Sequence, residues 1–147
     1  MNDDTPATAQ QKAMLDLHLE HVVAEMALDV ERVMATLDDS PEYEFCGVAL
    51  AGTAAIRRFY SALIEDIIPR VIGTNLRARS AGTDVLIDEG TMTLDLNDGL
   101  RPTWSFCSVI SYENGRIKGE RVYYADPEAV RFHRDWIASR NLAAVPS

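Results

Sequence analysis

The sequence predicts an α+β domain in which a curved antiparallel sheet wraps around N-terminal helices, forming a cone with an apolar pocket. Helical periodicity fills the first half of the chain, and four strand-length runs fill most of the second half. Sequences suited to tight hairpins separate these runs. The helices before the sheet are too few to cover both of its faces, so a sheet curled around them is the simplest arrangement.

The first helix is expected over 11–28, and a second, shorter helix runs from Asp29, a suitable N-cap, to the break before Pro41. Four apolar residues recur at helical spacing on one face of the first helix: Leu15, Leu19, Val22 and Met26. Further apolar residues lie beside this face. This wide stripe predicts that the rest of the domain covers most of the helix. A short strand is expected next, at 43–46.

A third helix is expected from Thr53, its N-cap, to the residue before Pro69. Its apolar residues keep the helical period: Ile56, Phe59, Tyr60, Leu63 and Ile67. Four strands follow, at 71–80, 85–96, 103–112 and 116–125. The breaks 97–99 and 113–115 contain Asp-Gly and Asn-Gly, which tolerate the positive φ of tight turns, so an antiparallel meander is expected. Pro127 then begins a last helix, through Trp136.

Composition favours a single domain without metal or cofactor. The chain has 147 residues, of which 47% are hydrophobic, enough for a core without disulfides. We expect one domain at 11–138, a flexible N-terminal tail at 1–10 and a C-terminal tail at 139–147. Two cysteines, Cys46 and Cys107, are too few for a disulfide framework and favour the cytoplasm.

Net charge and hydropathy disfavour two classes of partner, nucleic acids and membranes. The net charge is −9, which disfavours binding to nucleic acid or to anionic membranes. The N-terminus lacks the features of a signal peptide, and no apolar stretch is long enough to span a membrane. No phosphate-binding loop, serine nucleophile motif or metal-spaced cluster is present, so we expect no cofactor and no metal.

Two segments carry a resemblance to a known family. The segment 52–60, Gly-Thr-Ala-Ala-Ile-Arg-Arg-Phe-Tyr, resembles the third helix of the SnoaL-like polyketide cyclase and ketosteroid isomerase-like branch of the nuclear-transport-factor-two-like superfamily. The segments 114–117 and 120–124 resemble its final hairpin. The resemblance covers roughly residues 14–126 and implies a cystatin-like α+β barrel with a pocket. The same fold serves isomerases, cyclases, hydrolases, dehydratases and binding proteins, so it marks the fold rather than the activity.

The resemblance also assigns candidate residues. His21 takes the position of the tyrosine that ketosteroid isomerases use as an oxyanion donor. Glu44 is the nearest match to their aspartate base, and Cys107 replaces their protonated aspartic acid. Because two of three roles are changed, steroid isomerase activity is not expected. Asp126 lies near the acid of SnoaL-like cyclases, offset by one residue.

The residues themselves leave alternatives open. His21 suits a general acid/base, because imidazole titrates near neutral pH, but it could equally be a hydrogen-bonded core histidine. Glu44 is either a base opposite His21 or a solvent-facing strand residue. His18 lies one turn before His21, but no Cys or carboxylate stands at ligand spacing around the pair, so a metal site is not expected there. His133 is expected on the surface.

The last strand is more informative. Glu120, Val122, Tyr124 and Asp126 share one face, which the resemblance makes the concave one. Two carboxylates and a phenol around an apolar pocket suit proton transfer on a carbonyl or enol. Alternatively, Glu120 pairs with neighbouring strands and Asp126 caps the last helix. The predicted catalytic residues are His21, Glu44, Glu120 and Asp126, and the predicted ligand-binding residues are Tyr43, Phe59, Tyr60, Glu89, Trp104, Cys107, Val122 and Tyr124.

These features predict a cofactor-independent enzyme of the isomerase or cyclase type. It would move protons by general acid/base catalysis on a small to medium apolar carbonyl compound and form a homodimer through the outer sheet face. The first alternative is a non-catalytic binding or dimerisation module. The second is a hydrolase or dehydratase, which in this fold uses an Asp-Arg-Asp arrangement, with Arg77 or Arg79 as the arginine.

Overall fold

A computed structural model describes residues 6–143 of the chain. The elements are α1 (Ala9–Met26), α2 (Val30–Ala35), β1 (Glu42–Phe45), β2 (Val48–Ala51), α3 (Thr53–Asp66), the short 3-10 helix η1 (Ile68–Arg70), β3 (Val71–Ala81), β4 (Val85–Leu94), β5 (Thr103–Glu113), β6 (Arg116–Tyr124) and α4 (Pro127–Ser139). Parts of the two expected tails, 1–5 and 144–147, lie outside the described residues. Helix α1 begins at Ala9, because Thr8 caps it with a reciprocal bond to Gln11.

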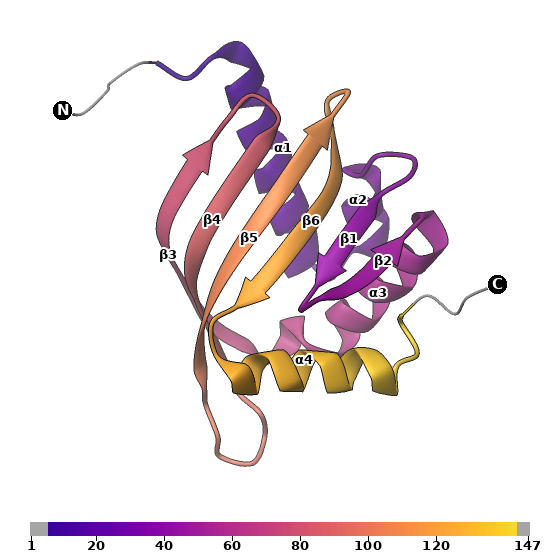
Figure 1. Cartoon of the computed structure of the whole chain (residues 1–147), viewed down its shortest axis with the longest axis vertical. Coiled ribbons are helices and arrows are strands. Elements are labelled where there is room, and N and C mark those ends of the chain that lie inside the picture. Colours follow the sequence, from indigo (N-terminus) through magenta and orange to yellow (C-terminus); the bar gives the residue numbers. More distant parts are fainter. Residues whose placement is uncertain (1–5, 144–147) are drawn as a thin grey trace.

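One curved sheet of six strands, in the order β2-β1-β6-β5-β4-β3, forms the body of the molecule. The helices α1, α2 and α3 pack against one side of this sheet, while α4 crosses its end (Figure 1). The predicted α+β cone is confirmed, and the sheet does not close into a complete barrel. One pairing is parallel rather than antiparallel: β1 runs alongside β6. No hairpin connects these two strands, so they are not required to run antiparallel.

The meander β3 to β6 agrees closely with the pattern of strands and turns in the sequence. Its turns use Asn97 and Asn114 with positive φ, each followed within two residues by a glycine with positive φ. Strand β2, in contrast, was not expected. Its hairpin turns at Cys46 and Gly47, which both have positive φ, and a cysteine at such a position gives no turn signal in the sequence.

The orientation of α1 differs from the expected one. Leu19 is 62% exposed and Met26 is 59% exposed, so the apolar stripe that we expected to be covered faces outward. The buried residues of α1 are instead Met14, His21 and Ala24. The helix therefore places polar side chains against the sheet, and its own hydrophobic pattern did not reveal this.

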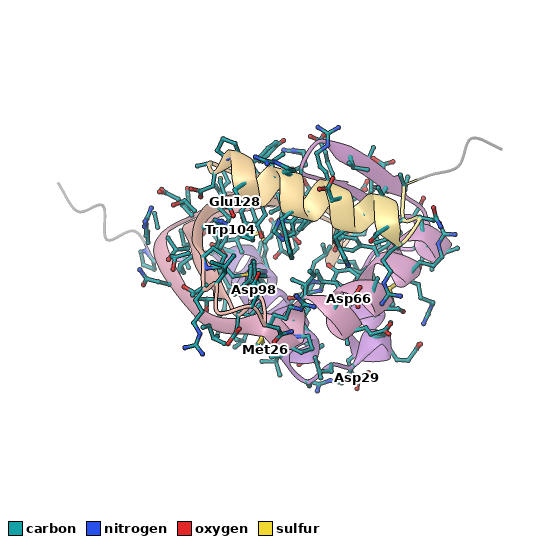
Figure 2. The ribbon with its side chains drawn as sticks, turned by 90° about the horizontal axis from the view of Figure 1, so that it is seen from below. Met26, Asp29, Asp66, Asp98, Trp104 and Glu128 are labelled. Carbon is teal, nitrogen blue, oxygen red and sulfur yellow. The ribbon has the colours of Figure 1, made fainter. Side chains whose placement is uncertain are left out.

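Helix α4 closes one end of the cone. Its side chain His133 is 0% exposed, which contradicts the expected surface position. Trp104, at the start of β5, packs against Phe132 and His133 of this helix. Figure 2 views this end, with Trp104 close to the first turn of α4 at Glu128.

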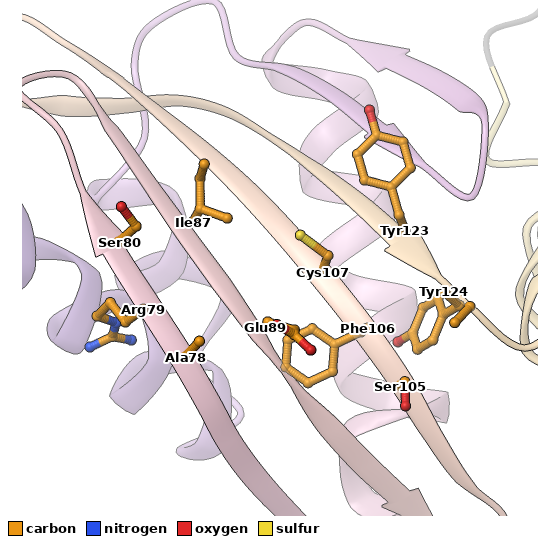
Figure 3. A pocket seen from close by; sticks show the side chains of 11 residues that line it. Ala78, Arg79, Ser80, Ile87, Glu89, Ser105, Phe106, Cys107, Tyr123 and Tyr124 are labelled. Carbon is orange, nitrogen blue, oxygen red and sulfur yellow. The ribbon is translucent and has the colours of Figure 1, made fainter.

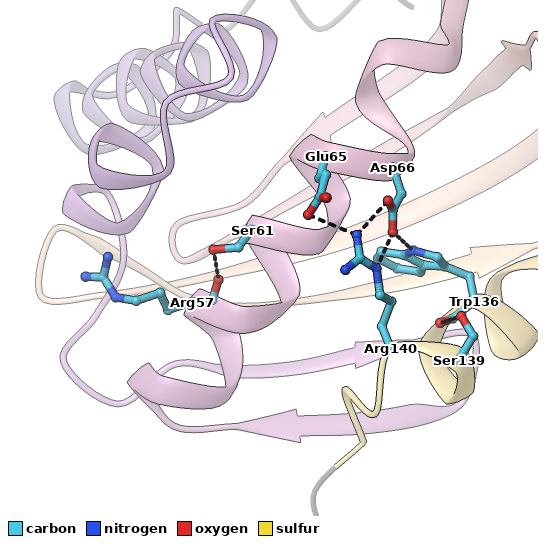
Figure 4. Close-up of polar contacts among 7 residues, drawn as sticks. All are labelled: Arg57, Ser61, Glu65, Asp66, Trp136, Ser139 and Arg140. Atoms are coloured by element: carbon cyan, nitrogen blue, oxygen red, sulfur yellow. Dashed lines mark hydrogen bonds and ion pairs between the residues drawn. The ribbon is translucent and has the colours of Figure 1, made fainter.

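The C-terminal end of α4 is tied to α3. Asp66 accepts hydrogen bonds from Trp136 Nε1 at 2.8 Å and from Arg140 at 2.7 Å, and Arg140 also pairs with Glu65 (Figure 4). Leu142 is buried beyond the end of the helix. None of the helices among residues 6–143 is long and apolar enough to cross a membrane.

Candidate functional site

Ionisable side chains gather between α1 and the concave face of the sheet. His18, His21 and Glu25 follow each other at helical spacing, so they share the inner face of α1. From the sheet, Asp88 on β4 lies 3.4 Å from His18 Nε2. Glu120 on β6 is close enough that its charge acts on His21. The interior thus combines two imidazoles and three carboxyl groups.

The contacts of His21 define its tautomer. His21 Nδ1 lies 2.7 Å from Thr36 Oγ1, and that hydroxyl donates to the carbonyl oxygen of Val33 at 2.6 Å. A hydroxyl group has one hydrogen to donate. Thr36 must therefore accept from His21, and Nδ1 of the ring carries a hydrogen. The proton that His21 gains and loses on titration is therefore the one on Nε2.

His21 Nε2 faces two further groups. It lies 3.0 Å from the hydroxyl of Tyr60 and 3.2 Å from Glu25 Oε1. The Tyr60 hydroxyl in turn lies 2.7 Å from that of Tyr43. Burial alone would lower the pKa of His21, but the hydrogen bond and charge of Glu25, together with the charge of Glu120, raise it above its usual value. Burial raises the pKa values of Tyr43 and Tyr60 well above normal, so both remain neutral phenols.

Glu120 is the most strongly perturbed acid of the cluster. Burial, followed by the charge of Glu25, raises its pKa to about 7, while His21 acts in the opposite direction. Protein atoms surround its carboxyl group, yet the residue keeps some accessible surface. No hydrogen bond or ion pair from residues 6–143 reaches this carboxyl group. Glu120 therefore presents an acid with a pKa near neutrality to the interior.

A second polar group lies beside the first. Arg79 on β3 donates two hydrogen bonds of 2.7 Å to the carboxylate of Asp88, which is buried and also faces His18. Burial lowers the pKa of His18, with Asp88 acting against this effect. Sequence reasoning missed Asp88, although it alternates with the buried Leu86 on β4. Within residues 6–143, no three His, Cys, Asp or Glu side chains are arranged to hold a metal ion.

Aromatic residues fill the opposite end of the interior. Tyr124 stacks on His133 at 4.6 Å between ring centroids, and Trp104 packs against both rings. His133 Nδ1 donates to the carbonyl oxygen of Ala129 at 2.8 Å, and its Nε2 has no partner among the described residues. Burial lowers the pKa of His133 to about 4, so the ring is neutral. Phe59 belongs to the same core, next to Tyr43 and Trp136.

The structure thus brings together His21, Tyr43, Tyr60 and Glu120, all of which the sequence predicted as site residues. Val122 and Tyr124 also lie on the inner side of β6, beyond Glu120. Val122 is buried in the core. The four residues come from α1, α3, β1 and β6, elements that are far apart in the sequence.

Other predicted residues lie elsewhere. Tyr43 points inward, so its neighbour Glu44 faces the outer side of β1, in register with Arg121 and away from His21. Asp126 is the N-cap residue of α4, but its carboxylate accepts from the backbone N–H of Ser105 at 2.9 Å and makes no capping bond to the helix. Glu89 is paired in register with Cys107, and both lie on the outer face of the sheet.

The largest pocket is on this outer face. It has a volume of about 500 Å³ and crosses β3, β4, β5 and β6 (Figure 3). Ile87, Glu89, Cys107 and Tyr123 line it, and its surface is mostly apolar. A smaller pocket of about 120 Å³ lies between α1 and the β5–β6 turn, where Met14, Leu17 and Tyr112 line it. Burial, followed by the charges of Glu120 and Asp88, raises the pKa of Tyr112.

Solved structures of other proteins share this architecture. A candidate SnoaL-like polyketide cyclase from Jannaschia sp. CCS1 matches with a TM-score of 0.70 and 12% identity, over 97% of this chain and 99% of that chain. A candidate isomerase from Bacillus subtilis matches with a TM-score of 0.70 and 18% identity, over 88% and 97%. An NTF2-like protein of unknown function from Burkholderia xenovorans LB400 matches with a TM-score of 0.63 and 17% identity, over 82% and 88%.

Comparison at the level of sequence adds nothing to this result, because no family model and no curated protein matches the chain. At identities below 20%, the structural matches establish the fold and leave the chemistry to be argued from the residues. The element order, the curved sheet and the resemblance in segment 52–60 agree with them. The chain has the nuclear-transport-factor-two-like fold.

Proposed function

We propose that the protein is a cofactor-independent enzyme that moves a proton on a small apolar carbonyl compound, as an isomerase or a cyclase does. The observation that carries this proposal is Glu120, an interior carboxyl group with a pKa of about 7 and no protein partner among the described residues. An acid of this strength exchanges protons readily at neutral pH. The candidate isomerase and candidate cyclase of the same fold support the proposal by analogy.

In the proposed reaction, the Glu120 carboxylate removes a proton from the carbon next to the carbonyl group. The electron pair of the broken C–H bond forms a carbon–carbon double bond, and negative charge develops on the carbonyl oxygen. The hydroxyl of Tyr43 and the charge of His21 stabilise this oxygen. In a substrate with a second double bond next to that carbon, the Glu120 carboxylic acid then returns the proton to the far carbon of that double bond. The double bond shifts toward the carbonyl group, which re-forms, and the isomerisation is complete. A cyclase would use the same enolate as a nucleophile.

Hydrogen exchange tests the proposal without knowledge of the substrate. The protein is incubated in D₂O with a panel of small apolar ketones, and NMR follows the loss of protons next to the carbonyl group. Wild type should accelerate exchange for at least one ketone, and Glu120→Gln should reduce the acceleration by about a hundredfold or more, as is typical for loss of a general base. Glu42→Gln, an exposed acid on β1, is the matched control. If wild type accelerates none of the ketones, proton transfer is refuted, and a binding module or the second candidate described below remains.

The pH dependence follows from the role of Glu120. A base must be ionised, so exchange should rise with pH up to about 7, the pKa of this group, and should fall at higher pH, where His21 loses the charge that stabilises the oxyanion. A rate that falls as pH rises toward 7 would show that the protonated form of Glu120 acts. The profile is measured with the best ketone of the panel and compared with that of Glu120→Gln.

A second candidate, a dehydratase or hydrolase, has its own observation. Arg79, whose side chain is 37% exposed, and the buried Asp88 form a forked pair at the edge of the interior, beside His18. Such a pair could hold a water molecule or a departing hydroxyl group. Mass spectrometry of β-hydroxy ketones and epoxides after incubation would reveal loss or gain of water. Asp88→Asn should abolish that reaction and leave ketone exchange measurable.

We also propose that two copies of the chain associate through the outer sheet face. Ile87 is 39% exposed there and Tyr123 is 43% exposed, on either side of the largest pocket. Light scattering after gel filtration should give a dimer for wild type and a monomer for Tyr123→Glu. Leu19→Glu, at a more exposed apolar residue on α1, should leave the dimer intact.

A further inference from the structure

His21, Tyr60 and Tyr43 form a linear chain of hydrogen bonds inside the protein. The distances are 3.0 Å from Nε2 of His21 to the Tyr60 hydroxyl and 2.7 Å from there to the Tyr43 hydroxyl. Each hydroxyl has one hydrogen, so a hydroxyl that donates to one neighbour in the chain can only accept from the other. The group at one end of the chain therefore sets the direction of donation for all of its hydrogen bonds. That end is His21, because Thr36 holds a hydrogen on Nδ1 and leaves only Nε2 to change.

With a neutral ring, Nε2 carries a lone pair. Tyr60 then donates its hydrogen to His21, and Tyr43 donates its own hydrogen to Tyr60. Both hydroxyl hydrogens are used within the chain. The Tyr43 oxygen retains only lone pairs for any further contact, so it cannot stabilise a negatively charged oxygen.

With a charged ring, Nε2 carries a hydrogen that it donates to Glu25, at 3.2 Å, and toward Tyr60. Tyr60 can no longer donate to His21, so its hydrogen turns to the Tyr43 oxygen. The hydrogen of Tyr43 is then free. Glu44 pairs in parallel with Arg121, so Tyr43 and Glu120, one residue earlier on each strand, are neighbours across β1 and β6, and this end of the chain lies toward Glu120. The charge of Glu120 also acts on the Tyr43 hydroxyl.

The groups that surround the ring favour the charged state. They come from α1, the end of α2, α3, β1 and β6: Glu25, His18, Thr36, Tyr60, Tyr43 and Glu120. Glu25 and Glu120 stabilise positive charge on the ring, whereas His18 would oppose it if it were itself charged. His18 has a lowered pKa, so this opposition is weak near neutral pH.

We propose that the charge on His21 sets the direction of the hydrogen bonds in this chain, and that the charged ring presents the Tyr43 hydroxyl hydrogen to the oxyanion of an enolate-like ligand beside Glu120. His21 would thus be a positioning residue, and Tyr43 the group that touches the ligand. The ligand assignment rests on the proposed function. The reversal of the chain does not, because it follows from the hydrogen bonds alone.

NMR of the histidine ring nitrogens tests the reversal directly. In ¹⁵N-labelled wild type, Nδ1 of His21 should stay protonated at every pH, while Nε2 titrates. Titration of Nδ1 instead would overturn the proposal, and this measurement needs no variant.

The variant Tyr43→Phe gives a second test of the reversal. Tyr60 needs Tyr43 as an acceptor only when the His21 ring is charged. Loss of this acceptor disfavours the charged ring, so the variant should lower the pKa of His21. Tyr112→Phe, which removes a buried hydroxyl without a partner among the described residues, is the control and should not change it. An unchanged His21 pKa in Tyr43→Phe would also refute the reversal.

Binding of 4-nitrophenolate tests the ligand assignment, because this coloured anion imitates an enolate. Wild type should bind it more weakly as pH rises and His21 loses its charge. Tyr43→Phe should weaken binding at least about tenfold, the usual effect of losing a hydrogen bond to a charged oxygen. Equal binding by wild type and Tyr43→Phe would overturn the assignment. Failure of ketone exchange, with both results as expected, would leave the reversal and the anion site intact and remove only the catalytic function.

Discussion

The three histidines occupy different surroundings, and these surroundings give them different chemistry. His21 lies between Thr36 and Glu25, which raises its pKa. His133 lies among aromatic rings with a single hydrogen bond, and its pKa falls to about 4. The same side chain is therefore stabilised as a cation at one end of the interior and as a neutral ring at the other. Opposite effects of pH on stability follow.

His133 should make the protein less stable as pH falls. Its pKa is about 4 in the folded state and 6.5 in the unfolded chain, so its contribution is complete above 6.5 and is lost progressively toward 4. At about pH 5 the loss amounts to roughly 2 kcal/mol. Urea denaturation of wild type and His133→Gln at pH 5 and pH 7.5 measures it. The stability of the variant should change less between the two pH values, and parallel changes would contradict the assignment.

His21 should act in the opposite direction. Its folded-state pKa is raised, so the stability from its charged form is complete below the unfolded value of 6.5 and is lost as pH rises through the folded value. His21→Gln should therefore destabilise the protein, by roughly 2 kcal/mol at low pH, and by less at high pH. Denaturant melts across this range measure the difference. A variant as stable as wild type at low pH would mean that the contacts with Glu25 and Tyr60 add nothing.

Some site residues could be found from the sequence and others could not. His21 stands out as a histidine in an apolar helix, and Glu120 as an acid within a strand, so both could be named as candidates. Asp88 and Glu25 were not named as candidates, although Ala24 and Met26 flank Glu25 in the sequence. Their role depends on which side chains meet across the cone, and a sequence pattern does not contain that information.

At the scale of elements, α1 is the helix whose faces the sequence assigns wrongly. It has apolar residues around most of its circumference, so the hydrophobic period does not select the buried side. The sheet presents Asp88 and Glu120 to the helix, and these acids need polar partners. His18 and His21 supply them, beside the buried Met14 and Ala24, while Leu19 and Met26 are left on the outside.

Two substitutions in α1 test this orientation. Leu19→Gln should change stability by less than about 0.5 kcal/mol, because its side chain already faces solvent. Met14→Ala, at a buried position of the same helix, should destabilise by about 2 kcal/mol or more. Chemical denaturation of both variants gives the comparison. A larger loss for Leu19→Gln than for Met14→Ala would show that the helix is turned the other way.

The meander is the part of the fold that the sequence describes best. Each of its strands was expected within a few residues of its observed bounds, since turn residues and alternation are local signals. The β1–β2 hairpin and the parallel pairing of β1 with β6 were not expected. These depend on contacts between distant parts of the chain, where local preference gives no guidance.

At the scale of the whole molecule, the parallel pairing is what joins the two halves of the sheet. Glu44 and Phe45 of β1 pair with Arg121 and Val122 of β6, and this is the strand contact between the β1–β2 hairpin and the meander. The site depends on it, because Tyr43 comes from β1 and Glu120 from β6. Any change that separates these strands should affect stability and the site together.

Gly119 permits this approach. A Cβ atom at this position would lie 1.8 Å from the carbonyl oxygen of Glu42, a backbone atom at the start of β1 that cannot simply rotate away. Gly119→Ala should therefore push β1 from β6 and destabilise the fold by at least about 2 kcal/mol. Gly73→Ala on β3 is the matched control, because no atom lies within 4 Å of its added Cβ. Thermal denaturation compares the two, and NMR of the Tyr43 hydroxyl region reports on the site. If Gly119→Ala melts at the same temperature as Gly73→Ala, the β1–β6 contact is not what holds the two halves of the sheet together.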